Sequence, residues 1–161
     1  MDNKSLRIGS ALLISLSLLG FASAAHAETP EGCAPLPEAP AAVAQAVRDM
    51  FGALSREDAG GFRDSTTEGF FAYDAGQNMS AATLWNIVKD GRAAGAAYVW
   101  TVHEAKVQAV CDLATIAYVN RGSVRDAAGE HPVVWLESAV LRYEGRRWRV
   151  AFLHSSLAKS K

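Results

Sequence analysis

Apolar residues repeat with a helical period early in the chain and with a period of two in its second half. A helix is predicted to start near Pro40, which suits a first helical turn, and a second to run from Ser80, a good N-cap, to Ala94, before Gly95. The apolar stripe of the first helix, at i, i+4, i+7, i+8 and i+11, consists of Val43, Val47, Met50, Phe51 and Leu54.

The residues between and after these helices predict strands. Residues 62–66 are expected to form one helical turn, and residues 69–73 a short strand. Four longer segments rich in Val, Tyr, Trp, Thr and Ile follow, separated by tight turns. They span residues 97–110, 113–125, 132–143 and 147–155. Helices followed by a four-stranded antiparallel meander indicate an α+β fold with the helices packed on one face of the sheet.

The composition fits one soluble globular domain. The chain has 161 residues, of which 50% are hydrophobic and 20% are charged, and two full domains are improbable at this length. Its 16 basic and 17 acidic residues give a net charge of -1, so no basic surface is available to neutralise a run of phosphates. The sequence therefore predicts no nucleic-acid partner.

Residues 1–27 have the features of a secretory signal peptide. Lys4 and Arg7 precede an apolar stretch over residues 11–21, and an Ala-His-Ala cleavage site ends at Ala27. The apolar stretch is shorter than the about 20 residues that a transmembrane helix needs. We expect cleavage before Glu28, no membrane anchoring afterwards, and a periplasmic or secreted protein.

The mature chain is predicted to have three segments and one pair of cysteines. An extended, Pro-rich lead-in covers residues 28–39, the folded domain residues 40–157, and a basic tail residues 158–161. In an oxidising compartment Cys33 and Cys111 can form a disulfide, which would stabilise the fold by about 4 kcal/mol in the chain-entropy model. Two unpaired thiols are the alternative, because sequence does not reveal the geometry of the bond.

Several segments resemble the nuclear transport factor 2-like superfamily, and within it SnoaL-like proteins and the domain of unknown function 4440. The resemblance covers residues 40–157 and implies a cone-shaped, cystatin-like α+β fold, in which a strongly curved sheet wraps around the N-terminal helices. It also implies a pocket at the open end and frequent homodimers through the outer sheet face. It implies no single activity, because the fold hosts enzymes and binding domains alike. The segments that carry it are residues 51–55 with Asp58, 135–138, 145–150 and 152–155.

Glu137 and His154 are the candidate catalytic residues. If the turn between the last two strands has two residues, odd positions before it share a face with even positions after it. The carboxylate and the imidazole are then within reach of each other. Such groups are costly on an apolar face unless paired or wet, and in a pocket they could serve as an acid/base pair. The alternative is a structural hydrogen bond, and the resemblance assigns neither residue a role.

Aromatic and polar side chains near the expected mouth are candidate ligand-binding residues. Rings with a few polar groups suit a small, largely apolar organic molecule, although core packing is the alternative for most of them. Asp74 is a second-rank polar candidate, and the face occupied by Asn120 depends on the turn at residues 126–129. The candidates are Tyr73, Trp85, Trp100, Tyr118, Asn120 and Trp135.

Known catalytic and cofactor motifs do not occur in the sequence. It contains no C-x-x-C, H-E-x-x-H, G-x-G-x-x-G, P-loop or G-x-S-x-G pattern, and its histidines lack acidic neighbours at metal-ligand spacing. We therefore expect no cofactor and no metal. Three functions remain: an exported domain that binds a small apolar ligand, a cofactor-free isomerase, dehydratase or hydrolase using Glu137 and His154, and a structural dimer whose cone is filled.

Overall fold

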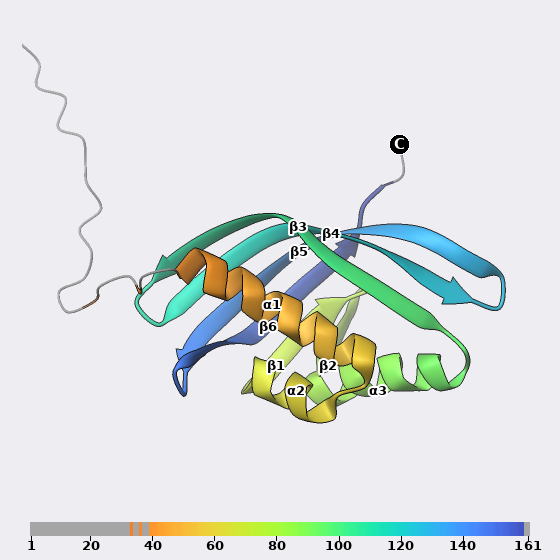
Figure 1. Ribbon diagram of the computed structural model, residues 1–161, viewed down its shortest axis with the longest axis horizontal. Helices are drawn as coiled ribbons and strands as arrows, with labels where there is room; N and C mark the ends of the chain where they lie inside the picture. The colour runs from red at the N-terminus through yellow and green to blue at the C-terminus, as the bar shows by residue number, and fades with distance from the viewer. Residues whose placement is uncertain (1–32, 34–35, 37–38, 160–161) are drawn as a thin grey trace, which may run out of the picture.

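The computed structural model describes Cys33, Leu36 and residues 39–159 of the chain. The predicted helices and the last four strands are confirmed to within a few residues at each end (Figure 1). One short strand, β2, was not predicted. The elements are α1 (Ala39–Arg56), α2 (Ala59–Ser65), β1 (Thr66–Asp74), β2 (Gln77–Ser80), α3 (Ala81–Ala93), β3 (Ala97–Val110), β4 (Leu113–Asp126), β5 (Gly129–Glu144) and β6 (Arg147–Leu157).

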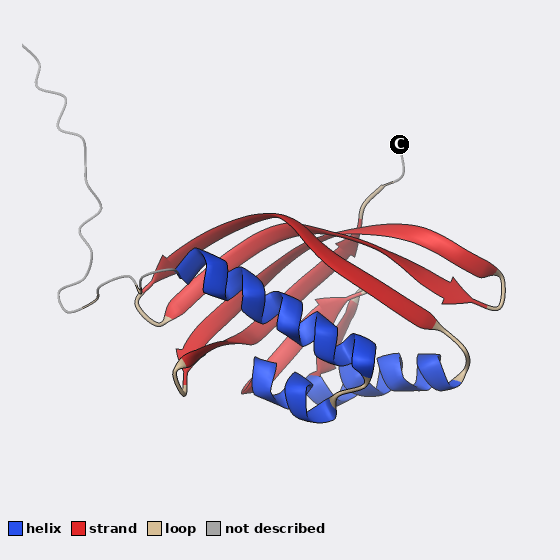
Figure 2. Cartoon of the chain, in the orientation of Figure 1, coloured by secondary structure: helices blue, strands red, loops and turns tan. Residues whose placement is uncertain are grey.

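All six strands form one curved sheet in the order β2-β1-β6-β5-β4-β3. The antiparallel meander is confirmed for β3 to β6. The sheet is nevertheless mixed, because β1 pairs with β6 in parallel and with β2 in antiparallel orientation. The helices lie against one face of the sheet, as Figure 2 shows. We call this face the inner face and the opposite one the outer face.

Local sequence signals explain where the helices begin and end. The apolar stripe of α1 is buried, with Val43, Val47 and Met50 wholly removed from solvent, and α1 packs on β3 and α2. The predicted N-cap of α3 is confirmed, because Ser80 Oγ accepts a hydrogen bond from the Thr83 N–H at 3.1 Å. Packing of an apolar face, such as the buried stripe of α1, supplies most of the stability of helices in proteins.

A disulfide joins Cys33 to Cys111, with 5.1 Å between their Cα atoms. The predicted disulfide is therefore observed, and the alternative of two unpaired thiols is excluded. The bond attaches the lead-in to the turn between β3 and β4 and closes a loop with a sequence separation of 78 residues. It constrains the unfolded chain over most of the length of the domain.

Gly122 allows the backbone of β3 to approach the neighbouring strand β4 closely. It pairs with Trp100, and a Cβ at Gly122 would overlap the backbone carbonyl of Val99. We predict that Gly122→Ala lowers the free energy of unfolding by about 2 kcal/mol, because the obstacle is backbone that cannot move aside cheaply. Urea denaturation measures this loss.

Gly69→Ala is the matched control for that substitution. Gly69 also lies in a strand, but a Cβ there meets no atom within 4 Å. We expect a change within about 0.5 kcal/mol for this exposed position. Equal losses in the two variants would show that the close approach of β3 to β4 is not what requires Gly122.

Candidate functional site

Four polar side chains meet on the inner face of the sheet. Tyr118 and Asn120 come from β4, Glu137 from β5 and Ser155 from β6, and all four are buried. Register places them on one face, because Tyr118 pairs with Glu137 and Glu137 pairs with Ser155. We call these four residues the inner polar cluster.

Asn120 holds the cluster together across three strands. Its Oδ1 accepts a hydrogen bond from the backbone N–H of Thr101 on β3 at 2.8 Å. Its Nδ2 donates to Glu137 Oε2 on β5 at 2.9 Å. Because the Thr101 N–H can only donate, the Asn120 oxygen must face β3 and its NH₂ group must face the carboxylate. Asn120 has no exposed surface, so it fixes the position of Glu137 from within the core.

Burial dominates the electrostatics of Glu137. Removal from water raises the pKa of this carboxyl above its ordinary value, and the charge of Asp74 raises that pKa further. Polar contacts from Asn120, Ser155 and Tyr118 act in the opposite direction, because they favour the charged form, but they do not cancel the effect of burial. The site therefore holds a carboxyl group that keeps its proton to a higher pH than an exposed glutamate does.

The Tyr118 hydroxyl is the unsatisfied group of the cluster. Burial, and then the neighbouring Glu137, raise the pKa of Tyr118 well above its ordinary value. Its oxygen is buried and interacts with the neighbouring Glu137 carboxyl, yet no contact among the described residues reaches the geometry of a full hydrogen bond. A buried hydroxyl without a partner carries a desolvation cost of about 1–3 kcal/mol, which a ligand bearing a polar atom would relieve.

Two tryptophans border the cluster on the inner face, and the ring of Trp100 also packs on Phe51 of α1. Trp135 pairs with Asn120 and Trp100 with Gly122, so both indoles lie on the inner face, and both are half-buried. Leu157, which pairs with Trp135, is 70% exposed. The inner face is thus open to solvent just beyond the cluster. Of the predicted ligand-binding residues, Trp100, Tyr118, Asn120 and Trp135 come together here.

The predicted pairing of Glu137 with His154 is wrong. The turn has two residues, as assumed, because Glu144 pairs with Arg147. The register then shifts by one residue between the pairs Leu141–Val150 and Val140–Phe152, so that Ala151 is extra. Beyond this bulge His154 faces outward and is exposed, while Ser155 takes the place beside Glu137.

Tyr73 also lies on the outer face, away from the cluster. It pairs with His154 across the parallel strands β1 and β6 and is 46% exposed. Its ring contacts Phe152, with 5.5 Å between ring centroids. A shallow hollow of about 370 Å³ adjoins His154 on this face. Glu137 also borders this hollow, although its side chain projects from the opposite, inner face of the sheet.

Trp85 lies in a separate groove between α2 and α3. This groove measures about 540 Å³, and Trp85 stacks on Phe62 in its wall, with ring centroids 5.8 Å apart. We call it the α2–α3 groove; its lining includes Phe62, Arg63, Glu68, Ala81, Trp85 and Arg149. The predicted ligand-binding residues are therefore divided among the inner polar cluster, the α2–α3 groove and the outer face.

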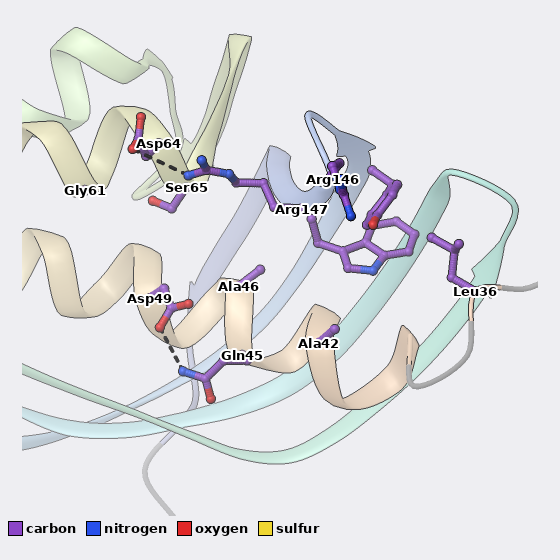
Figure 3. Close-up of a pocket in the computed structure, with 12 residues that line it drawn as sticks. Leu36, Ala42, Gln45, Ala46, Asp49, Gly61, Asp64, Ser65, Arg146 and Arg147 are labelled. Atoms are coloured by element: carbon purple, nitrogen blue, oxygen red, sulfur yellow. Dashed lines mark hydrogen bonds and ion pairs between the residues drawn. The ribbon is translucent and has the colours of Figure 1, made fainter.

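A hollow beside α1 adds little chemistry. It measures about 590 Å³ and lies between α1, α2 and the β5–β6 turn (Figure 3). Trp148 and Ala46 line it, and three of its charged side chains contact neighbours: Arg147 Nη1 lies 3.5 Å from Asp64 Oδ2, and Gln45 donates to Asp49. We infer that this hollow is less suited to a ligand than the cluster, because these charged side chains are already partnered.

The described residues offer neither a metal site nor a membrane-spanning helix. Among residues 33, 36 and 39–159, no group of three His, Cys, Asp or Glu side chains is arranged to hold a metal ion. In that same part of the chain, no helix combines the length and apolar character that crossing a membrane requires.

Comparison with solved structures identifies the fold. The chain is similar to a ketosteroid isomerase-like protein from Erwinia carotovora atroseptica, with a TM-score of 0.62 and 17% identity over 78% of this chain and 100% of that one. It is also similar to an NTF2-like protein of unknown function from Pseudomonas putida, with a TM-score of 0.62 and 18% identity over 79% and 92%. This chain has the nuclear transport factor 2-like fold.

A third similar structure is the CaMKII hub of S. rosetta, with a TM-score of 0.63 and 18% identity over 74% of this chain and 97% of the hub. No protein-family model matches the sequence, and no curated protein is significantly similar to it. The nuclear transport factor 2-like resemblance and the cone-shaped α+β fold class are thus confirmed. The finer resemblance to SnoaL-like proteins and to the domain of unknown function 4440 stays a prediction.

The importance of two residues of the site, Ser155 and Asp74, is not recognised from the sequence alone. Ser155 is absent from the predicted site residues, because strand alternation without the bulge places His154 and not Ser155 on the face of Glu137; with the bulge, the same alternation places Ser155 beside Glu137. Asp74 ranked second among the polar candidates, and it lies close enough for its charge to act on Glu137. Its place at the end of a strand just before a turn was the available signal.

The raised pKa of Glu137 predicts a pH-dependent stability. The folded state holds this proton more tightly than the unfolded chain, so stability is gained as pH falls from the folded-state pKa towards the ordinary value of 4.5. Above the folded-state pKa the cost of burying the charge is fully present. We expect Glu137→Gln to fold and to lose this dependence, which urea denaturation across the pH range measures.

Glu144→Gln serves as the control for this measurement. Glu144 lies on the same strand as Glu137 but is exposed. Its substitution is expected to leave the pH profile of the wild type unchanged. A Glu137→Gln protein whose stability follows the wild-type profile in parallel would contradict the raised pKa.

Proposed function

We propose that this domain binds a small, largely apolar organic molecule at the open end of its inner face, with one polar atom of the ligand directed at the inner polar cluster. The half-buried indoles of Trp100 and Trp135 supply apolar walls on either side. Such a combination of rings with few convergent polar groups is typical of small-molecule sites. The nuclear transport factor 2-like fold supports a ligand-binding or isomerase-type domain.

The observation that carries this proposal is the unpartnered Tyr118 hydroxyl. A hydroxyl kept only for packing is better replaced by a phenylalanine ring, because the desolvation cost then disappears. A hydroxyl kept for a ligand is costly without the ligand and is satisfied when the ligand binds. Glu137, beside it, offers either a proton or a lone pair to the same polar atom.

Tyr118→Phe separates these two roles of the hydroxyl. We expect the variant to be as stable as the wild type or slightly more so, and to bind 2-naphthol about tenfold more weakly, because it loses one hydrogen bond in a site of low dielectric. Thermal unfolding gives the first quantity, and titration of 2-naphthol fluorescence gives the second.

Naphthalene is the matched ligand in this experiment. It has the same apolar rings without the hydroxyl, so Tyr118→Phe is expected to leave its affinity unchanged. If the substitution destabilises the fold and does not alter 2-naphthol binding, the hydroxyl is structural. Mass spectrometry of the molecules that co-purify with the exported protein then identifies the natural ligand.

A second function, cofactor-free isomerisation, is favoured by the nearness of Asp74 to Glu137. The charge of Asp74 raises the pKa of Glu137, so two neighbouring carboxyls of unlike environment could divide the roles of proton donor and proton acceptor. Such a pair can remove a proton from a carbon next to a carbonyl, return it at another carbon, and donate a hydrogen bond to the carbonyl oxygen meanwhile. Similar folds include proteins described as ketosteroid isomerase-like.

Asp74→Asn tests the isomerase proposal. With a ketosteroid whose double bond is out of conjugation with its carbonyl, we expect the wild type to form the conjugated product, followed by absorbance. Asp74→Asn is expected to lower kcat at least 100-fold, because the general base is lost, while Glu144→Gln, at an exposed acid of β5, leaves it unchanged. A wild type without measurable turnover leaves binding as the function.

Export and self-association complete the proposal. The predicted signal peptide lies outside the described residues, and the Cys33–Cys111 disulfide supports a periplasmic or secreted location; sequencing of the mature N-terminus tests cleavage before Glu28. Aromatic rings exposed on the outer face, Phe71 and Tyr73 among them, support a homodimer through that face. Sedimentation equilibrium measures that association.

A further inference from the structure

The α2–α3 groove combines an aromatic wall with groups that favour negative charge. Its volume of about 540 Å³ lies within the range of sites for small organic molecules. The stack of Trp85 on Phe62, with 29° between the ring planes, presents apolar aromatic surface suited to a planar ring. This groove is separate from the inner polar cluster, because no residue of the cluster lines it.

Arg149 supplies an unsatisfied donor in this groove. Its Nε atom is buried and has no hydrogen-bond partner among the described residues, and Arg149 is part of the groove lining. A guanidinium N–H that is buried without an acceptor is costly, since the group is always charged. A carboxylate matches the planar, forked geometry of a guanidinium better than any neutral acceptor.

The N-terminus of α3 lies at the same groove. Ala81 and Ala82, the first two residues of this 13-residue helix, line it. The first N–H groups of a helix have no intrahelical acceptor, and the helix dipole adds partial positive charge there. Ser80 satisfies the N–H of Thr83 only. Two features, a helix N-terminus and a half-buried arginine whose Nε has no partner, thus favour an anion at one place.

The charge of the lining indicates how much negative charge the ligand carries. Arg63 and Arg149 contribute two positive charges and Glu68 one negative charge, which leaves one net positive charge. We propose that the α2–α3 groove is a second binding site, which takes a planar aromatic monocarboxylate, with its ring on Trp85 and its carboxylate between Arg149 and the α3 N-terminus.

Binding of 2-naphthoate to the whole mature protein, measured by isothermal titration calorimetry, tests this site. We expect saturable binding at one site, weakened by added salt, and at least tenfold weaker binding of 2-naphthamide, which has the same rings without the charge. Arg149→Gln is expected to weaken 2-naphthoate binding about tenfold, and Trp85→Leu to weaken both ligands. Equal affinities for the acid and the amide would overturn the proposal.

Arg142→Gln is the matched control for charge. Arg142 pairs with Arg149 across β5 and β6 but does not line the groove, so the same loss of charge there is expected to change 2-naphthoate affinity by less than twofold. Tyr118→Phe is likewise expected to leave it unchanged, which keeps this site distinguishable from the inner polar cluster. Thermal unfolding verifies that each variant is folded, and a folded Arg149→Gln protein with wild-type affinity contradicts the proposal.

Discussion

One extra residue in β6 determines which side chains face the helices. Strand residues alternate between the two faces, so the insertion of Ala151 reverses the assignment of every later residue of β6. Leu153 and Ser155 consequently face inward, whereas Phe152 and His154 face outward. With the bulge, a small hydroxyl stands beside Glu137, and the imidazole is removed from the core. Ser155 belongs to the inner polar cluster because of this reversal.

The sequence predicts what depends on neighbouring residues and misses what depends on distant ones. The apolar stripe of α1 and the Ser80 cap of α3 are local signals, and both are observed. The Ala151 bulge carries no such signal, because an alanine in a strand looks the same whether or not it is paired. Likewise, nothing near Tyr73 indicates that β1 joins β6 in parallel. These pairings depend on how the whole sheet packs around the helices and not on the residues next to them in the sequence.

Glu137 illustrates how stability and function oppose each other in this core. Burial of the carboxyl is only partly offset by Asn120, Ser155 and Tyr118, since the pKa of Glu137 remains raised. A site designed only for stability would place an apolar residue here, because a poorly compensated buried charge is unfavourable. The retained acid and the unpartnered Tyr118 hydroxyl are therefore best understood as groups whose partner arrives from outside the chain.

The two proposed ligand sites would select different molecules, although both have aromatic walls. In the inner polar cluster the polar groups are an acid with a raised pKa and hydroxyls, and a second negative charge brought there would be repelled by Asp74 and by ionised Glu137. In the α2–α3 groove the positive charge of Arg149, whose Nε is buried without a partner, has the opposite preference. Apolar bodies of similar size are thus sorted by their polar ends: neutral hydroxyl or carbonyl groups fit the cluster, and carboxylates fit the groove.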